Sequence, residues 1–208
     1  MQGFTTVVQQ LLIAASCPIC RRTDETGPLP CKACRNQFNL SDQGVSGASP
    51  LPWHALGWYQ GSFRRLLLQV KTSRWQRRIL PALMAHFRAQ LALPSQAELV
   101  PIPSWKRTES LCNPLPQLIA QGFQRPIQPL LIRTRAGLSQ HHLDRRLRLH
   151  NMRGAFAAVA PPSGRPIWLV DDILTTGATA MAAQQALQHR GHDVAGLLCL
   201  GRTPLNRR

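Results

Sequence analysis

The chain has 208 residues, of which 44% are apolar, and its formal net charge is +16. This length allows one domain of ordinary size with a small appendage. No run of about 18 apolar residues exists, which excludes a membrane-spanning helix. The charge favours polyanionic partners such as nucleic acid, nucleotides or an anionic membrane. Because 22 Arg accompany only 3 Lys, genome base composition is an alternative origin for this charge, and much of the Arg would then be solvated surface.

The first 45 residues are expected to form a short helix followed by a small metal-binding module. Cys17 and Cys20 form one CxxC pair, and Cys31 and Cys34 form a second pair ten residues later. Two such pairs let four thiolates converge tetrahedrally on one Zn²⁺. A four-Cys site is closed, so this zinc is expected to hold structure rather than take part in chemistry.

The N-terminal sequence lacks the positive start of a secretory signal, because Met1 to Ser16 contains no Lys or Arg. We therefore expect a cytoplasmic protein. The alternative to zinc is a pair of disulfides or redox-active CxxC motifs. A cytoplasmic setting disfavours disulfides, since thiols are kept reduced there.

Residues 46–208 are expected to form one α/β domain, in which helices flank a parallel sheet. A linker rich in Ser, Gly and Pro is predicted over Ser41–Pro52. Apolar periodicity then predicts, in chain order, a strand, two helices, a strand, a helix, a strand and a basic helix. Their ranges are Ala55–Tyr59, Phe63–Lys71, Gln76–Leu93, Glu98–Pro103, Leu115–Phe123, Pro129–Ile132 and His141–His150.

The last third of the chain has the clearest pattern. Pro166–Val170 is a continuous apolar run, as expected for a strand buried on both faces. Ala178–Arg190 has helical spacing, and Val194–Leu200 is a second apolar run in which Cys199 is expected to be buried. A strand, a helix and a strand in so short a stretch predict a βαβ unit with parallel strands.

Polar residues with distinct chemistry follow the first of these strands. Asp171 and Asp172 end the apolar run, and Thr175–Thr179 leads into the helix. Free N–H groups at a helix N-terminus bind phosphate, and Gly177 would let the backbone approach such a ligand closely. Threonine hydroxyls can donate to phosphate oxygens, whereas carboxylates suit ribose hydroxyls or a bridging Mg²⁺. The pattern therefore predicts a site for a sugar 5′-phosphate.

The segment Val170–Thr179 resembles the motif with which type I phosphoribosyltransferases bind 5-phosphoribosyl-1-pyrophosphate (PRPP). The resemblance implies that Asp171 and Asp172 contact the ribose hydroxyls of PRPP, which carries Mg²⁺. It also implies that the 5′-phosphate is wrapped by Thr175, Thr176, Gly177, Ala178 and Thr179.

The rest of the chain is similar to one branch of these proteins, the ComF (competence protein F, GntX-like) family. The similarity rests on the two CxxC pairs, the helix that ends at Lys71, the strand Leu99–Pro103, and the set Gln140, Leu143, Arg148, Asn151 and Ala155–Phe156. It implies a role in natural competence, DNA uptake or use of external DNA. The chain departs from the family at Ser110–Pro114, where an Arg-Gly-Phe-Asn-Gln segment is usual and only Asn113 remains. This departure removes the Arg and the Gly that the resemblance would place in contact with pyrophosphate.

Three functions follow from these observations. A phosphoribosyltransferase would displace pyrophosphate from C1 of PRPP, with Asp171, Asp172 and Lys71 as catalytic residues and Lys106 and Arg107 as further partners of pyrophosphate. The first alternative is a non-catalytic adaptor with a vestigial PRPP pocket, in which the zinc module and the segment 133–153 contact single-stranded DNA. The second is a nucleobase salvage enzyme. Lys71 could also simply end a helix.

Overall fold

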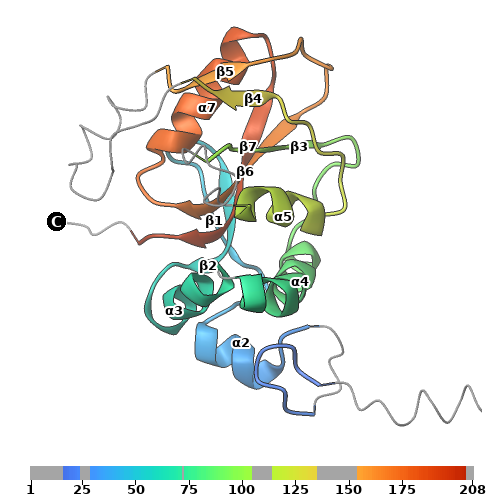
Figure 1. The fold of residues 1–208 in the computed structure, drawn as a ribbon, viewed down its shortest axis with the longest axis vertical. Coiled ribbons are helices and arrows are strands. Elements are labelled where there is room, and N and C mark those ends of the chain that lie inside the picture. The colour runs from blue at the N-terminus through green and yellow to red at the C-terminus, as the bar shows by residue number, and fades with distance from the viewer. Residues whose placement is uncertain (1–15, 24–28, 72, 105–113, 135–153, 205–208) are drawn as a thin grey trace, which may run out of the picture.

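The computed structural model describes residues 16–23, 29–71, 73–104, 114–134 and 154–204 (Figure 1). Its helices are α2 (Lys32–Phe38), α3 (Gly61–Val70), α4 (Ser73–Gln90), α5 (Leu115–Gly122) and α7 (Ala178–His189). Its strands are β1 (Val45–Gly47), β2 (Trp53–Trp58), β3 (Glu98–Pro101), β4 (Leu131–Arg133), β5 (Phe156–Ala158), β6 (Ile167–Leu174) and β7 (Val194–Arg202). Among these helices, none combines the length and hydropathy needed to cross a membrane. The predicted N-terminal helix and the predicted helix His141–His150 lie outside the described residues.

The main sheet has five strands in the order β1-β2-β7-β6-β3. Strands β2, β7, β6 and β3 run parallel to one another, and β1 joins the edge antiparallel to β2. The expected βαβ unit is confirmed, because β6 and β7 are parallel neighbours linked by α7. The predicted α/β class with flanking helices is therefore correct, although the antiparallel edge makes the sheet mixed.

Two hydrophobic cores lie on opposite faces of this sheet (Figure 1). Successive residues of β7 alternate between them: Leu197 and Cys199 belong to the core beneath α7 and the β4–β5 pair, whereas Leu198 and Leu200 belong to the core beneath α3, α4 and α5. Side chains of a strand point alternately to the two faces of its sheet. This double burial explains why β6 and β7 are continuous apolar runs.

The segment predicted as a linker, Ser41–Pro52, contains strand β1. Its residues lack an apolar pattern, so propensity gives no sign of a strand. A cross-strand contact accounts for it, because Gly47 lies opposite Trp53 of β2 and the ring of Trp53 packs against it: a Cβ at this glycine would lie 2.7 Å from Cζ2 of Trp53. The strand thus depends on tertiary packing, which overrides local preference.

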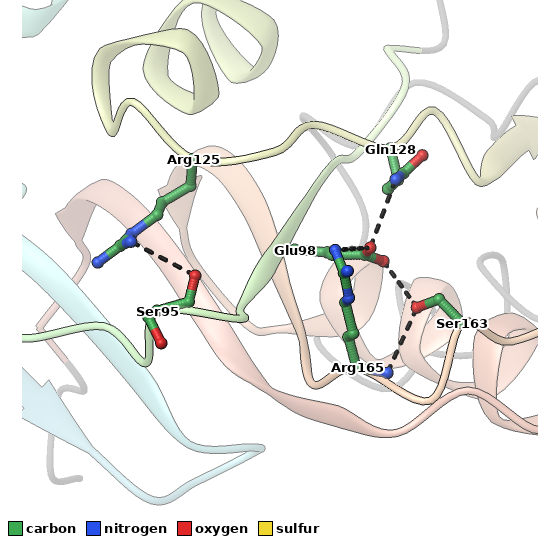
Figure 2. Close-up of polar contacts among 6 residues, drawn as sticks. All are labelled: Ser95, Glu98, Arg125, Gln128, Ser163 and Arg165. Carbon is green, nitrogen blue, oxygen red and sulfur yellow. Dashed lines mark hydrogen bonds and ion pairs between the residues drawn. The ribbon is translucent and has the colours of Figure 1, made fainter.

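A buried carboxylate holds the edge of the sheet at which β3 and β6 begin (Figure 2). Glu98 is only 2% exposed. It accepts hydrogen bonds from Ser163 Oγ at 2.9 Å and from Gln128 Nε2 at 3.4 Å, and its Oε1 lies 3.5 Å from Nη1 of Arg165. A buried charge with this many partners is well satisfied. We assign this cluster to structure, since it lies at the end of the parallel strands opposite the carboxyl ends.

Candidate functional site

The acidic pair lies within strand β6 and does not end it. Strand β6 continues to Leu174, because β7 also continues and pairs Leu174 with Arg202. The predicted strand Pro166–Val170 is therefore four residues too short at its carboxyl end. Asp171 is opposite Cys199 in the sheet, and both aspartates are partly buried near the carboxyl end of β6. Ligands of parallel sheets bind at this end.

Lys71 reaches the acidic pair from the C-terminus of α3. Its Nζ lies 2.9 Å from Oδ2 of Asp172, whose side chain is 14% exposed. The backbone N–H of Asp172 donates to Oδ1 of Asp171 at 2.8 Å. The structure thus brings together three of the residues proposed from the sequence as a catalytic group.

Burial and the neighbouring carboxylate disfavour the charge of Asp171. Burial, and then the charge of Asp172, raise the pKa of Asp171 well above its usual value. The charge of Asp171 also acts on Arg133 of β4. Burial lowers the pKa of the Arg133 guanidinium, and the charge of Asp171 offsets part of this shift. Arg133 also lies over the ring of Phe156, with its Cζ 5.1 Å from the ring centroid. A ligand that offers hydroxyl donors or a cation here would relieve the repulsion between the aspartates.

The loop between β6 and α7 presents the start of a helix. Gly177 is the N-cap of α7 in the left-handed conformation, at φ 82°, and as a glycine it offers no side chain to cap the helix. Thr176 Oγ1 accepts from the N–H of Ala178 at 3.4 Å, while Thr175 is exposed and Thr179 is partly buried. The first N–H groups of a helix lack intrahelical partners, so this end can bind an anion.

Position 177 requires glycine for a structural reason that was not predicted from the sequence. A Cβ built on it would lie 2.2 Å from Cγ of Pro50. The position therefore requires glycine for its positive φ and for close contact with the segment before β2. Room for a ligand is not needed to explain this glycine.

Arg202 is a second residue that sequence reasoning missed. It is 2% exposed, and its Nη1 donates to the carbonyl oxygen of Leu174 at 3.0 Å and to that of Thr175. Its guanidinium also lies 5.5 Å from the ring of Trp53. The only sequence signal was a charged residue two positions after the predicted apolar run Val194–Leu200. Arg202 and Pro50 thus hold the loop between β6 and α7 in place, Arg202 by hydrogen bonds to its carbonyls and Pro50 by packing against Gly177.

The four N-terminal cysteines converge as predicted. Their sulfurs all lie within 4.8 Å of one another, with Cys17 to Cys34 at 3.8 Å and Cys20 to Cys31 at 3.7 Å. With Zn–S bonds of about 2.3 Å, the sulfurs of a tetrahedral site are about 3.8 Å apart. The cluster therefore fits one structural metal ion of this kind.

The backbone around the cluster supports the sulfurs as metal ligands. Cys31 is the N-cap of α2, and its sulfur accepts from the N–H of Cys34 at 3.4 Å. Burial acts to raise the pKa of Cys17, but the N–H groups of Cys31, Cys20 and Ile19 outweigh it and lower that pKa to about 6. The thiolate is the form that binds metal. Ile19 and Phe38 pack against both this cluster and the core beneath α3.

Several residues named from the sequence lie outside the described residues. These are Lys106 and Arg107, the departing segment up to Asn113, and Gln140, Leu143, Arg148 and Asn151. Cys199, by contrast, is fully buried in β7 as predicted.

The chain matches no protein-family model. It is 30% identical over 207 residues to the "DNA utilization protein YhgH" of Escherichia coli strain K12, an alignment that covers 90% of each chain. It is also 30% identical over 194 residues to the protein of that name in Salmonella typhimurium, which covers 90% of this chain and 84% of the relative.

Proposed function

Since the chain belongs to the family of the DNA utilization protein YhgH, we propose that it binds a phosphoribosyl ligand, PRPP, and serves the use of DNA. The site is the carboxyl end of β6 and the start of α7. The proposal includes a cytoplasmic location and a boundary at residues 45–46 between the zinc module and the ligand-binding domain.

The observation that carries the proposal is the placement of opposite charges around one strand end. Asp171 and Asp172 offer acceptors for vicinal ribose hydroxyls. Two cations are available for pyrophosphate oxygens. One is Lys71, whose Nζ lies 2.9 Å from Oδ2 of Asp172, and the other is Arg133, whose pKa is affected by the charge of Asp171. The start of α7, whose N-cap is a glycine, lies a few residues further along and suits the 5′-phosphate.

Turnover is the finer part of the proposal. A phosphoribosyltransferase would break the bond between C1 and pyrophosphate while a nitrogen nucleophile attacks C1. Lys71 would stabilise the departing pyrophosphate, and the aspartates would orient the ribose. Mg²⁺, bound with PRPP, would neutralise further pyrophosphate charge, and Asp171 and Asp172 are the oxygen donors within reach of it.

Calorimetric titration of zinc-loaded protein with PRPP, with and without Mg²⁺, tests the site. We expect saturable binding by the wild type and its loss in the Asp171→Asn/Asp172→Asn variant. Asp42→Asn is the matched control, because its carboxylate is 86% exposed and lies near α2. Equal binding by all three proteins, or no binding by the wild type, would refute the proposal.

Bound PRPP then separates enzyme from adaptor. An enzyme releases pyrophosphate when a nucleobase is added, and that release should disappear in Lys71→Met. A non-catalytic sugar-phosphate sensor binds PRPP but releases no pyrophosphate with any base.

A further inference from the structure

A cleft of about 450 Å³ opens beside the carboxyl ends of β2 and β7. Its lining includes Ser49, Trp53, Trp58, Gln60, Arg202 and Pro204. This volume is within the range of about 300–1,000 Å³ that is usual for small-molecule sites. The cleft adjoins the loop after β6, since Arg202 bonds to the carbonyl of Thr175.

The cleft contains an aromatic platform. Trp58 is 40% exposed, which is high for so large an apolar side chain. Trp53, which is 5% exposed, donates from Nε1 to the carbonyl of Ser49 at 3.0 Å. The two indoles meet edge to face, with centroids 6.2 Å apart and an angle of 72°. The buried ring is thus fixed by its hydrogen bond and supports the exposed one.

Polar and charged groups border this platform. Gln60 follows Trp58 closely and offers both a donor and an acceptor. Arg202 lines the cleft, but its side chain is only 2% exposed, with the guanidinium bonded to the carbonyl of Leu174 and lying against the ring of Trp53. Outside the lining of the cleft, the first turns of α3, which begins directly after Gln60, carry the exposed Arg64 and Arg65, and Cζ of Arg64 lies 5.7 Å from the ring centroid of Tyr59. A ligand suited to this setting has a flat aromatic ring, hydrogen-bonding edges and a neighbouring negative charge.

We propose that this cleft binds a nucleobase of single-stranded DNA by stacking on Trp58, with the adjacent phosphates near Arg64 and Arg65. The inference rests on the proposed role in the use of DNA, but it is independent of the sugar-phosphate site. Stacking on an aromatic ring tolerates any base, because every base has a π-face. We therefore expect recognition without strong sequence preference.

Titration of a labelled short oligothymidylate into zinc-loaded full-length protein, read by fluorescence anisotropy, tests the proposal. We expect Trp58→Ala to weaken binding roughly 5- to 150-fold, the equivalent of one stacked base, and Trp58→Phe to retain most of the affinity. Leu68→Ala is the matched control, because Leu68 is 42% exposed on α3. It should bind as the wild type does. An abasic strand of equal length should bind wild type and Trp58→Ala alike.

Two results would overturn the inference. One is equal oligothymidylate affinity in wild type and Trp58→Ala. The other is thymidine 5′-monophosphate binding as tightly as the strand, which would assign the cleft to free nucleotides. The Asp171→Asn/Asp172→Asn variant separates the two sites. If it loses PRPP binding but binds oligothymidylate as the wild type does, both the sugar-phosphate site and the base-stacking cleft are supported. Absence of PRPP binding in the wild type refutes only the sugar-phosphate site, since oligothymidylate binding is measured separately.

Discussion

Gly177→Ala should destabilise the protein more than an ordinary glycine substitution does. Two costs add at this position. The left-handed backbone at φ 82° costs an alanine roughly 1–2 kcal/mol. A Cβ would also lie 2.2 Å from Pro50 Cγ, so the loop or the segment before β2 must shift, at a further cost of roughly 1–3 kcal/mol. We expect a total loss of about 2–5 kcal/mol in the free energy of unfolding.

Gly164→Ala is the matched control for this prediction. Gly164 has a similar φ of 75°, but no atom lies within 4 Å of where its Cβ would stand. Only the backbone cost of roughly 1–2 kcal/mol should therefore remain. Urea denaturation of both variants measures the difference directly. Equal stability of the two variants would show that Pro50 does not pack closely against Gly177. Pro50 would then not hold the loop between β6 and α7 in place.

Other predictions concern charges and metal. Asp171→Asn should raise the melting temperature at neutral pH. The folded-state pKa of Asp171 is raised, so its ionisation opposes folding above an unfolded-state pKa of about 3.9. The gain should shrink as the pH falls toward about 4, and a gain independent of pH would contradict this cause. Arg202→Met should weaken phosphate-ligand binding by loosening the carbonyls of Leu174 and Thr175, which calorimetry would detect; unchanged affinity would remove its positioning role. We expect metal analysis to find one zinc per chain in the wild type and none in Cys17→Ser/Cys34→Ser; a variant that keeps its zinc would refute the four-Cys site.

Local patterns predicted the part of the fold that carries the site. The apolar run before Asp171 and the helical spacing after Gly177 predicted β6 and α7, because burial on both faces and helix periodicity are visible in the sequence itself. The convergence of the four cysteines followed from their spacing in the same way.

Features that depend on contacts between separate elements escaped prediction. Strand β1 is supported by the packing of Trp53 on Gly47. Arg202 acts on a loop 27 residues earlier in the chain. The Trp53–Trp58 pair lies in a cleft that only the assembled β2 and β7 create. Contacts of this kind are set by tertiary structure, which local propensity does not encode.

The most direct test of the sugar-phosphate site is to map its amides. Isotope-labelled, zinc-loaded protein would be titrated with PRPP and Mg²⁺ while backbone amide resonances are followed by NMR. We predict that the largest shifts cluster at Thr175–Ala180, at the start of α7, and at Asp171 and Asp172. Saturable shifts confined to another surface, or no shifts at high PRPP concentration, would contradict the account.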